Sequence, residues 1–183
     1  VLEGNINNLY KIYNWNVRIL TLTWNYNNEL GFSHNNAGGL TNFGKDVVQY
    51  MNELGILIDV SHLSDDGFWD VISISNQPII ASHSNSRTLC DHSRNLTDEM
   101  IKAIANQGGV IGINLYGKFL NKNGYSTIDS IVQHIQHIYQ VGGIESIALG
   151  GDFDGFTGQL EVYNAGEWAR LIDRLKKKNI KNG

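Results

Sequence analysis

Five short apolar runs, rich in β-branched residues, recur along the chain and have the length of β-strands. The runs are close to continuously apolar, which is typical of strands buried on both faces of a parallel sheet. Their spacing is that of βαβ units, so we expect parallel strands joined by helices. The runs are Arg18–Trp24, Gly55–Ser61, Pro78–Ser82, Gly109–Leu115 and Ser146–Gly150.

Amphipathic stretches with capping residues lie between these runs. Thr41 can cap a helix that ends at Leu54, and Gly55 follows where a left-handed glycine is favoured. Ser64 and Thr97 can begin two further helices in the same way. In chain order, we expect helices at Asn5–Trp15, from Thr41 to Leu54, at Asp65–Ser75, at Asp98–Asn106, from Ser126 or Thr127 to Tyr139, and from about Ala165 to Lys178.

This alternation of strands and helices suits two architectures, a (β/α)8 barrel and an open doubly wound sheet. The first predicted strand is not followed by a Gly-x-Gly-x-x-Gly turn, which disfavours the dinucleotide-binding form of the open sheet. Five strands are too few to close an eight-stranded barrel, which takes ~250 residues, so a barrel would be incomplete. No linker-like or low-complexity segment interrupts the sequence, and residues 1–183 are predicted to form a single domain.

The composition narrows the possible function classes. The 183 residues carry a formal net charge of −4 at pH 7, which disfavours nucleic acid as the main partner. A single cysteine rules out an internal disulfide framework. No apolar run reaches the ~18–20 residues of a membrane span. The chain begins with Val1 and not with an initiator Met, so we expect a fragment or a processed product.

Polar side chains follow the predicted strands at their carboxyl ends, the edge where both architectures bind ligands. His62 follows the second strand, His83 the third and Asp152 the fifth, while the fourth ends with Asn114 before Tyr116. Neighbouring parallel strands lie ~4.8 Å apart, so the two imidazoles can converge on one metal ion. Zinc accepts histidine and carboxylate ligands, and Asp152 would add a ligand or act on a metal-bound water. A structural role for each histidine is the competing interpretation.

Other polar residues have simpler explanations. We interpret Asp59 as a satisfied core carboxylate and Cys90 as a small buried hydrophobe. His134 and His137 lie three residues apart on a helix that lacks the glutamate of the metalloprotease pattern, and we interpret them as surface residues. Arg94 follows the third strand in a loop, where its planar guanidinium can grip a carboxylate or form a loop-stabilising salt bridge.

Six short motifs follow one another from about Arg18 to Gly155, which is most of the chain. They are Thr21–Asn25 (Thr-Leu-Thr-Trp-Asn), Gly39–Gly44, Asp59–Ser64, Ala81–Asn85, Arg94–Leu96 and Gly150–Gly155 (Gly-Gly-Asp-Phe-Asp-Gly). Each motif alone is weak. In this order and at these spacings, the set resembles the membrane dipeptidase (renal dipeptidase) family of zinc peptidases.

The resemblance implies a (β/α)8 barrel, of the metal-dependent hydrolase type, that binds two zinc ions and hydrolyses dipeptides. By motif, His62 and His83 match two histidine ligands of that binuclear site. Asp152 matches the catalytic aspartate beside the metals, and Arg94 matches the residue that holds the terminal carboxylate of the substrate.

The sequence also departs from the family pattern. It lacks the His-x-Asp motif of the first barrel strand, and Glu3 lies too close to the strand at Arg18 for the role of the family's bridging glutamate. Trp24 stands where some members have a substrate-contacting histidine, so we count Trp24, together with Tyr116, among the substrate-binding candidates. About five to six βα units are present. We expect these residues alone to be inactive and to bind at most one metal ion, weakly, through the two histidines.

Two other functions stay open at this point. One is a non-catalytic binding protein derived from a barrel, which a metal titration would distinguish. The other is a metal-dependent hydrolase of cyclic amides or phosphoesters, which a substrate panel would distinguish. The dipeptidase interpretation predicts Zn²⁺ as cofactor, two ions in the complete enzyme, and a dipeptide as substrate. A homodimer is one candidate oligomeric state. The Thr-Leu-Thr-Trp-Asn segment resembles that of soluble relatives, so we expect a cytoplasmic location.

Overall fold

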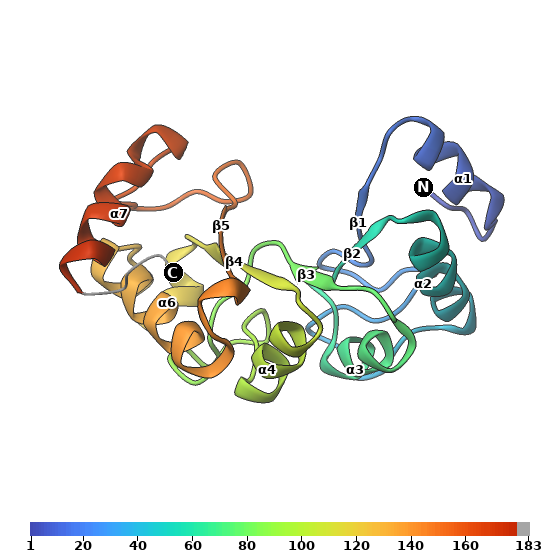
Figure 1. Ribbon diagram of the computed structural model, residues 1–183, viewed down its shortest axis with the longest axis horizontal. Coiled ribbons are helices and arrows are strands. Elements are labelled where there is room, and N and C mark those ends of the chain that lie inside the picture. Colours follow the sequence, from blue (N-terminus) through green and yellow to red (C-terminus); the bar gives the residue numbers. More distant parts are fainter. Residues whose placement is uncertain (179–183) are drawn as a thin grey trace. The chain divides into compact units, whose positions relative to one another are not determined.

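The computed structural model describes residues 1–178 and divides into two compact units, Val1–Ala81 and Ser82–Gly183. Both units combine parallel strands with helices, as Figure 1 shows. The predicted α/β class is therefore confirmed, whereas a single domain over residues 1–183 stays a prediction. In the part of the chain that the structure describes, no helix is long and apolar enough to cross a membrane.

The first unit contains three parallel strands. β1 (Ile19–Thr21) pairs with β2 (Leu57–Asp59), and β2 also pairs with β3 (Ile79–Ala81). All three lie inside the predicted apolar runs and are shorter than those runs. The helices of this unit are α1 (Asn7–Asn14), α2 (Asn42–Leu54) and α3 (Asp65–Ile74).

Local signals set the ends of α2 and α3, as the sequence predicts. The hydroxyl groups of Thr41 and Ser64 accept hydrogen bonds from the amides of Gly44 and Gly67, each at 3.0 Å. Gly55 ends α2 with φ 72°, a left-handed conformation that costs a glycine little. The helices bury one face each, through Val47, Val48 and Met51 of α2 and Phe68 and Val71 of α3.

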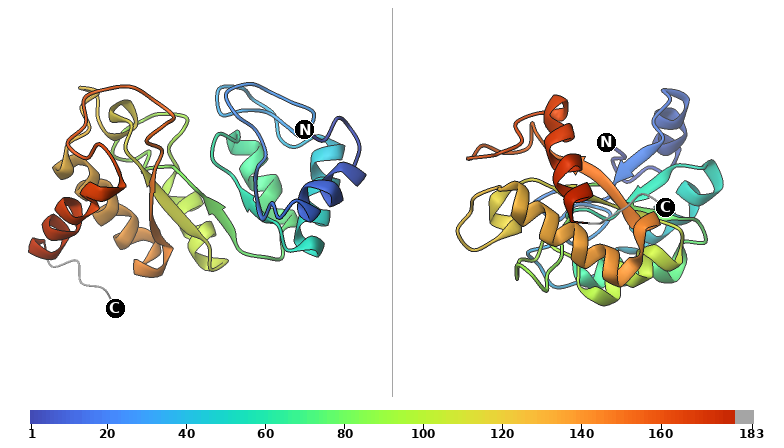
Figure 2. Two further views of the ribbon diagram at one scale, coloured as in Figure 1. Left: turned by 90° about the horizontal axis from the view of Figure 1, so that it is seen from above. Right: turned by 60° about the vertical axis from the view of Figure 1, so that its left-hand side comes forward.

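The second unit is built on two parallel strands, β4 (Val110–Asn114) and β5 (Ile147–Gly151). Their register shifts after Ile113, so that Asn114 lies opposite Gly151. Helices α4 and α6 pack against each other and against β4 (Figure 2). The helices are α4 (Asp98–Asn106), α5 (Gly117–Leu120), α6 (Ile128–Gly142) and α7 (Trp168–Lys177), with 3-10 turns at Ile144–Ser146 and Ala165–Glu167.

Three details differ from the sequence prediction. The short helix α5 was not expected, because four residues are too few to show a helical period. Helix α6 begins after Thr127, as predicted, but continues past Tyr139 to Gly142. The last predicted helix begins as a 3-10 turn and becomes α-helical only from Trp168.

Candidate active site

His62 follows β2 in an unusual backbone conformation. Its φ is 70°, in the left-handed region that few residues with a β-carbon adopt. The Nδ1 atom lies 3.0 Å from Oδ1 of Asn25, and the backbone carbonyl accepts hydrogen bonds from the Thr23 hydroxyl and the His34 amide. Since the Asn25 oxygen can only accept, the Nδ1 atom carries a proton, and in the neutral imidazole the lone pair is then on Nε2. That tautomer is the one in which Nε2 binds a metal ion.

Two aromatic rings lie near His62 in the first unit. The ring centroid of Trp24 is 6.4 Å from that of His62, and the centroid of His34 is 6.0 Å from it. The Trp24 side chain is 65% exposed, so it is available to a ligand. Asp59 behaves as predicted for a core carboxylate: it is buried and accepts hydrogen bonds from Thr21 Oγ1 and the Ser61 amide.

Asp152 directly follows β5 in the second unit and is also left-handed, with φ 64°. One carboxylate oxygen accepts a hydrogen bond of 3.0 Å from Nδ2 of Asn114, at the end of β4. The backbone of Gly155 packs directly against the Asp152 carboxylate. A Cβ at position 155 would lie only 2.2 Å from Oδ1 of Asp152. His62 and Asp152 are two of four non-glycine residues with positive φ in the described chain, and such strain concentrates at functional sites.

Asn114 is fixed in turn by a buried amide pair. The backbone amide of Asn114 donates to Oδ1 of Asn85 at 3.1 Å, and Nδ2 of Asn85 donates to the carbonyl of Asn114 at 3.0 Å. The Tyr116 amide donates to Oδ1 of Asn114 at 2.7 Å, so the Asn114 side chain can turn only its NH₂ group to Asp152. Sequence reasoning noted Asn114 as a strand end but missed its contact with Asp152.

Arg94 and His83 are in direct contact. Nη2 of Arg94 donates to the backbone carbonyl of His83 at 3.2 Å, and Nδ1 of His83 lies 2.7 Å from the Ser82 hydroxyl. Arg94 is only 4% exposed, and its guanidinium carbon lies 5.5 Å from the ring centroid of Phe119. The structure shows a buried guanidinium held by a backbone carbonyl and by the face of an aromatic ring.

Tyr116 lies in an aromatic row beside this arginine. Its ring centroid is 4.9 Å from that of Phe119 and 4.9 Å from that of Phe156. His92 approaches the same Phe119 ring at 4.5 Å, and its Nδ1 atom accepts a hydrogen bond from the Arg94 amide. Burial, followed by the charge of Arg94, lowers the pKa of His92. Arg94 therefore contacts the Phe119 ring through its guanidinium and the His92 imidazole through its backbone amide.

The prediction that His134 is a surface residue is wrong. His134 is 1% exposed, and burial lowers its pKa. The sequence contains a signal for this, since Ile131, Ile135 and Ile138 lie on the same face of α6 and are all buried. His137 is more exposed than His134 and is paired with Asp98, at 2.7 Å between Nε2 and Oδ1.

Cys90 is buried, as predicted, and its Sγ atom contacts the Lys118 carbonyl at 3.4 Å. Desolvation raises the pKa of this thiol above its ordinary value. A raised pKa disfavours the thiolate that a nucleophile or metal ligand requires. Cys90 therefore has no part in the candidate site.

The donor chemistry of the two histidines fits a metal ion. Within residues 1–178, no group of three or more His, Cys, Asp or Glu side chains could hold a metal. His62 belongs to the first unit, whereas His83, Arg94 and Asp152 belong to the second. The second unit thus contains four of the predicted site residues, namely His83, Arg94, Tyr116 and Asp152.

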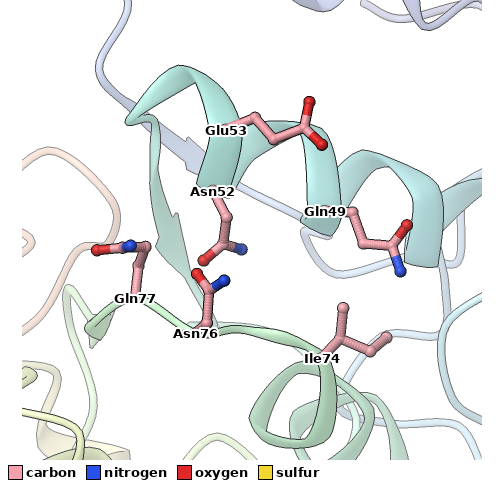
Figure 3. A pocket seen from close by; sticks show the side chains of 6 residues that line it. All are labelled: Gln49, Asn52, Glu53, Ile74, Asn76 and Gln77. Atoms are coloured by element: carbon pink, nitrogen blue, oxygen red, sulfur yellow. The ribbon is translucent and has the colours of Figure 1, made fainter.

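A polar pocket of about 490 Å³ lies elsewhere in the first unit (Figure 3). It is lined by the ends of α2 and α3 and by the segment that leads into β3. This is the amino end of β3, whereas His62 follows the carboxyl end of β2. The lining side chains are Gln49, Asn52, Glu53, Ile74, Asn76 and Gln77.

Comparison with known proteins decides the family. The family model described as membrane dipeptidase (peptidase family M19) matches residues 1–183. The chain belongs to this family. A Klebsiella pneumoniae relative, described as an uncharacterized protein in the pqqA 5′ region, is 36% identical over 186 residues, which cover 95% of this chain and 69% of the relative. Dipeptidase 3 of Macaca fascicularis is 35% identical over 162 residues, covering 84% of this chain and 33% of that protein.

A solved structure supports the same membership in the membrane dipeptidase family. A Rhodobacter sphaeroides metallopeptidase, crystallised with a phosphinate mimic of the dipeptide L-Ala-D-Ala, has a TM-score of 0.91 and 26% identity to this chain. The match covers 98% of this chain and 54% of that protein. The family fold is a TIM-type barrel, so the predicted barrel class is confirmed, while the chain spans about half the length of this structural relative.

Proposed function

We propose that this chain supplies part of a dipeptidase site that hydrolyses the peptide bond of dipeptides with the help of two zinc ions. The contact between Arg94 and the His83 carbonyl carries the proposal, because it joins a candidate carboxylate-binding group to a candidate metal ligand. Family membership supports the same assignment. A non-catalytic binding protein explains less well why Asp152 is oriented by a fully buried amide.

The residues of the second unit have distinct tasks in this proposal. Arg94 binds the terminal carboxylate of the dipeptide through its planar guanidinium. Asp152 accepts the proton of the attacking water and then returns it to the leaving amine, so that one carboxylate serves both steps. Tyr116 contacts the substrate from the aromatic row beside Arg94.

The first unit contributes His62 as a metal ligand and Trp24 as an exposed ring for substrate contact. Zinc, when bound, supplies a Lewis acid that polarises the peptide carbonyl and makes water more acidic. His62 and His83 would hold it through imidazole nitrogens. We further propose a cytoplasmic location. For the oligomeric state, a homodimer is the candidate to examine by sedimentation.

Zinc calorimetry and a hydrolysis assay test the proposal together. We expect zinc binding that weakens at least tenfold in His62→Ala and in His83→Ala, because each removes one ligand. His137→Ala is the matched control, since that histidine is paired with Asp98 on α4. Zinc binding that is equal in all four proteins would contradict the proposed ligands. Dipeptide hydrolysis by these 183 residues, lost in Asp152→Asn, would establish the function and overturn the expectation that they are inactive alone.

A further inference from the structure

His134 uses both of its ring nitrogens inside the protein. Nδ1 accepts a hydrogen bond from the Ser86 amide at 3.1 Å, and Nε2 lies 2.8 Å from the carbonyl of Leu120. An amide N–H can only donate and a carbonyl can only accept, so the imidazole is neutral with its proton on Nε2. His134 therefore joins three segments: α6, the loop after β3, and the end of α5.

Both partners of His134 lie in segments that contact the Arg94 side chain: Ser86 is in the loop after β3 that includes His83, and Leu120 is in α5 with Phe119. Ser86 pairs with Leu96, two residues after Arg94, in an isolated parallel bridge. Leu120 directly follows Phe119, whose ring lies under the guanidinium. The two hydrogen bonds of His134 thus reach the two segments between which the guanidinium is held. A rigid imidazole fixes the separation of those segments, because its nitrogens cannot move relative to each other.

We propose that His134 is a positioning residue for Arg94: it links the loop after β3 to α5 and thereby holds the guanidinium where a substrate carboxylate binds. The role of that guanidinium toward substrate rests on the proposed function. The link itself does not, since it is a pair of contacts within the second unit. The experiment therefore measures the link and the substrate effect separately.

Hydrogen exchange followed by NMR measures the link. His134→Leu removes both contacts, and we expect the Ser86 amide to exchange about tenfold faster, as for the loss of one buried hydrogen bond. The oxygen of His134→Asn occupies a place close to Nδ1 and is expected to restore most of the Ser86 protection. Ile138→Ala is the control, because it removes buried packing on the same helix without a polar contact. In wild type, ¹⁵N shifts should report the Nε2–H tautomer.

Calorimetry with zinc and two ligands measures the substrate effect. We expect His134→Leu to weaken binding of alanyl-alanine about tenfold and to leave alanyl-alanine amide unchanged, because the amide lacks the carboxylate that Arg94 binds. Unchanged Ser86 exchange overturns the link. Faster exchange with equal loss for both ligands, or with no loss, overturns the positioning role. A wild-type protein that binds neither ligand contradicts the proposed function and the substrate role with it, while the exchange data still decide the link.

Discussion

The two units hold their candidate site residues in different ways. In the first unit, His62 is fixed by a strained backbone and a few contacts, beside an exposed tryptophan. In the second unit, Asp152 is held by the buried amide of Asn114, and Arg94 is held by the His83 carbonyl and the Phe119 ring. The site residues of the second unit are therefore preorganised by buried contacts that also contribute to stability, whereas His62 in the first unit can be replaced with little loss of stability.

The largest expected effect is on Asn114 in the second unit. Asn114→Ala leaves the Tyr116 amide without its acceptor and removes the donor to Asp152, so we expect a loss of about 2–4 kcal/mol in the free energy of unfolding. Urea denaturation measures it. The control is Asn121→Ala, whose side chain bonds the backbone of Asn123 and Tyr125 in an exposed turn and should cost less than about 1 kcal/mol. Equal losses at both positions would contradict the special stabilising role of the buried Asn114 contacts.

An intermediate effect is expected from acid, and it too belongs to the second unit. Burial lowers the pKa of both His134 and His92, so the unfolded chain binds their protons more readily than the folded protein does. Stability should therefore be complete above about pH 6.5, the ordinary histidine pKa, and fall as the pH decreases below it. We expect a lower urea midpoint at pH 5.5 than at pH 7.5. In His134→Asn, which no longer titrates at this position, that decrease should be smaller; an unchanged decrease would be evidence against this cause.

The smallest effect is expected at His62 in the first unit. His62→Gly relieves the left-handed backbone while it removes the ring contacts, so the free energy of unfolding should change by less than about 0.5 kcal/mol. Zinc affinity should nevertheless fall at least tenfold. Asn16→Gly is the matched control, since Asn16 has φ 65° in the same unit and no predicted ligand role. A large destabilisation in His62→Gly alone would show that this unit is as tightly packed around its site as the second one.

Features governed by short-range chemistry were predictable from the sequence. Thr41, Ser64 and Thr97 cap their helices through their own side chains, and Gly55 ends α2 where a left-handed residue is needed. The strand positions followed from continuous apolar runs, because burial on both faces leaves little room for polar residues. The polar residues at the carboxyl ends of the strands, such as His62 and Asp152, were predictable because they directly follow these apolar runs.

Features that depend on register or on the partner of a helix face were not predictable. The bond from Asn114 to Asp152 requires the register shift between β4 and β5, which apolar runs do not encode. The prediction that His134 is a surface residue rests on its spacing from His137, whereas the buried Ile131, Ile135 and Ile138 around it place it on the inner face of α6. These apolar residues indicate that this face of α6 is buried. Only the three-dimensional structure shows that the His134 imidazole is hydrogen-bonded to Ser86 and Leu120.

Binding of alanyl-alanine and its C-terminal amide to wild type and Arg94→Lys, with zinc present, tests the central claim most directly. Lysine keeps the positive charge but loses the planar fork that grips a carboxylate. We predict that wild type prefers the dipeptide over the amide and that Arg94→Lys loses about tenfold in affinity for the dipeptide alone. Equal affinity of wild type for both ligands, or an Arg94→Lys variant that keeps the preference, would contradict the assignment of Arg94 to the substrate carboxylate.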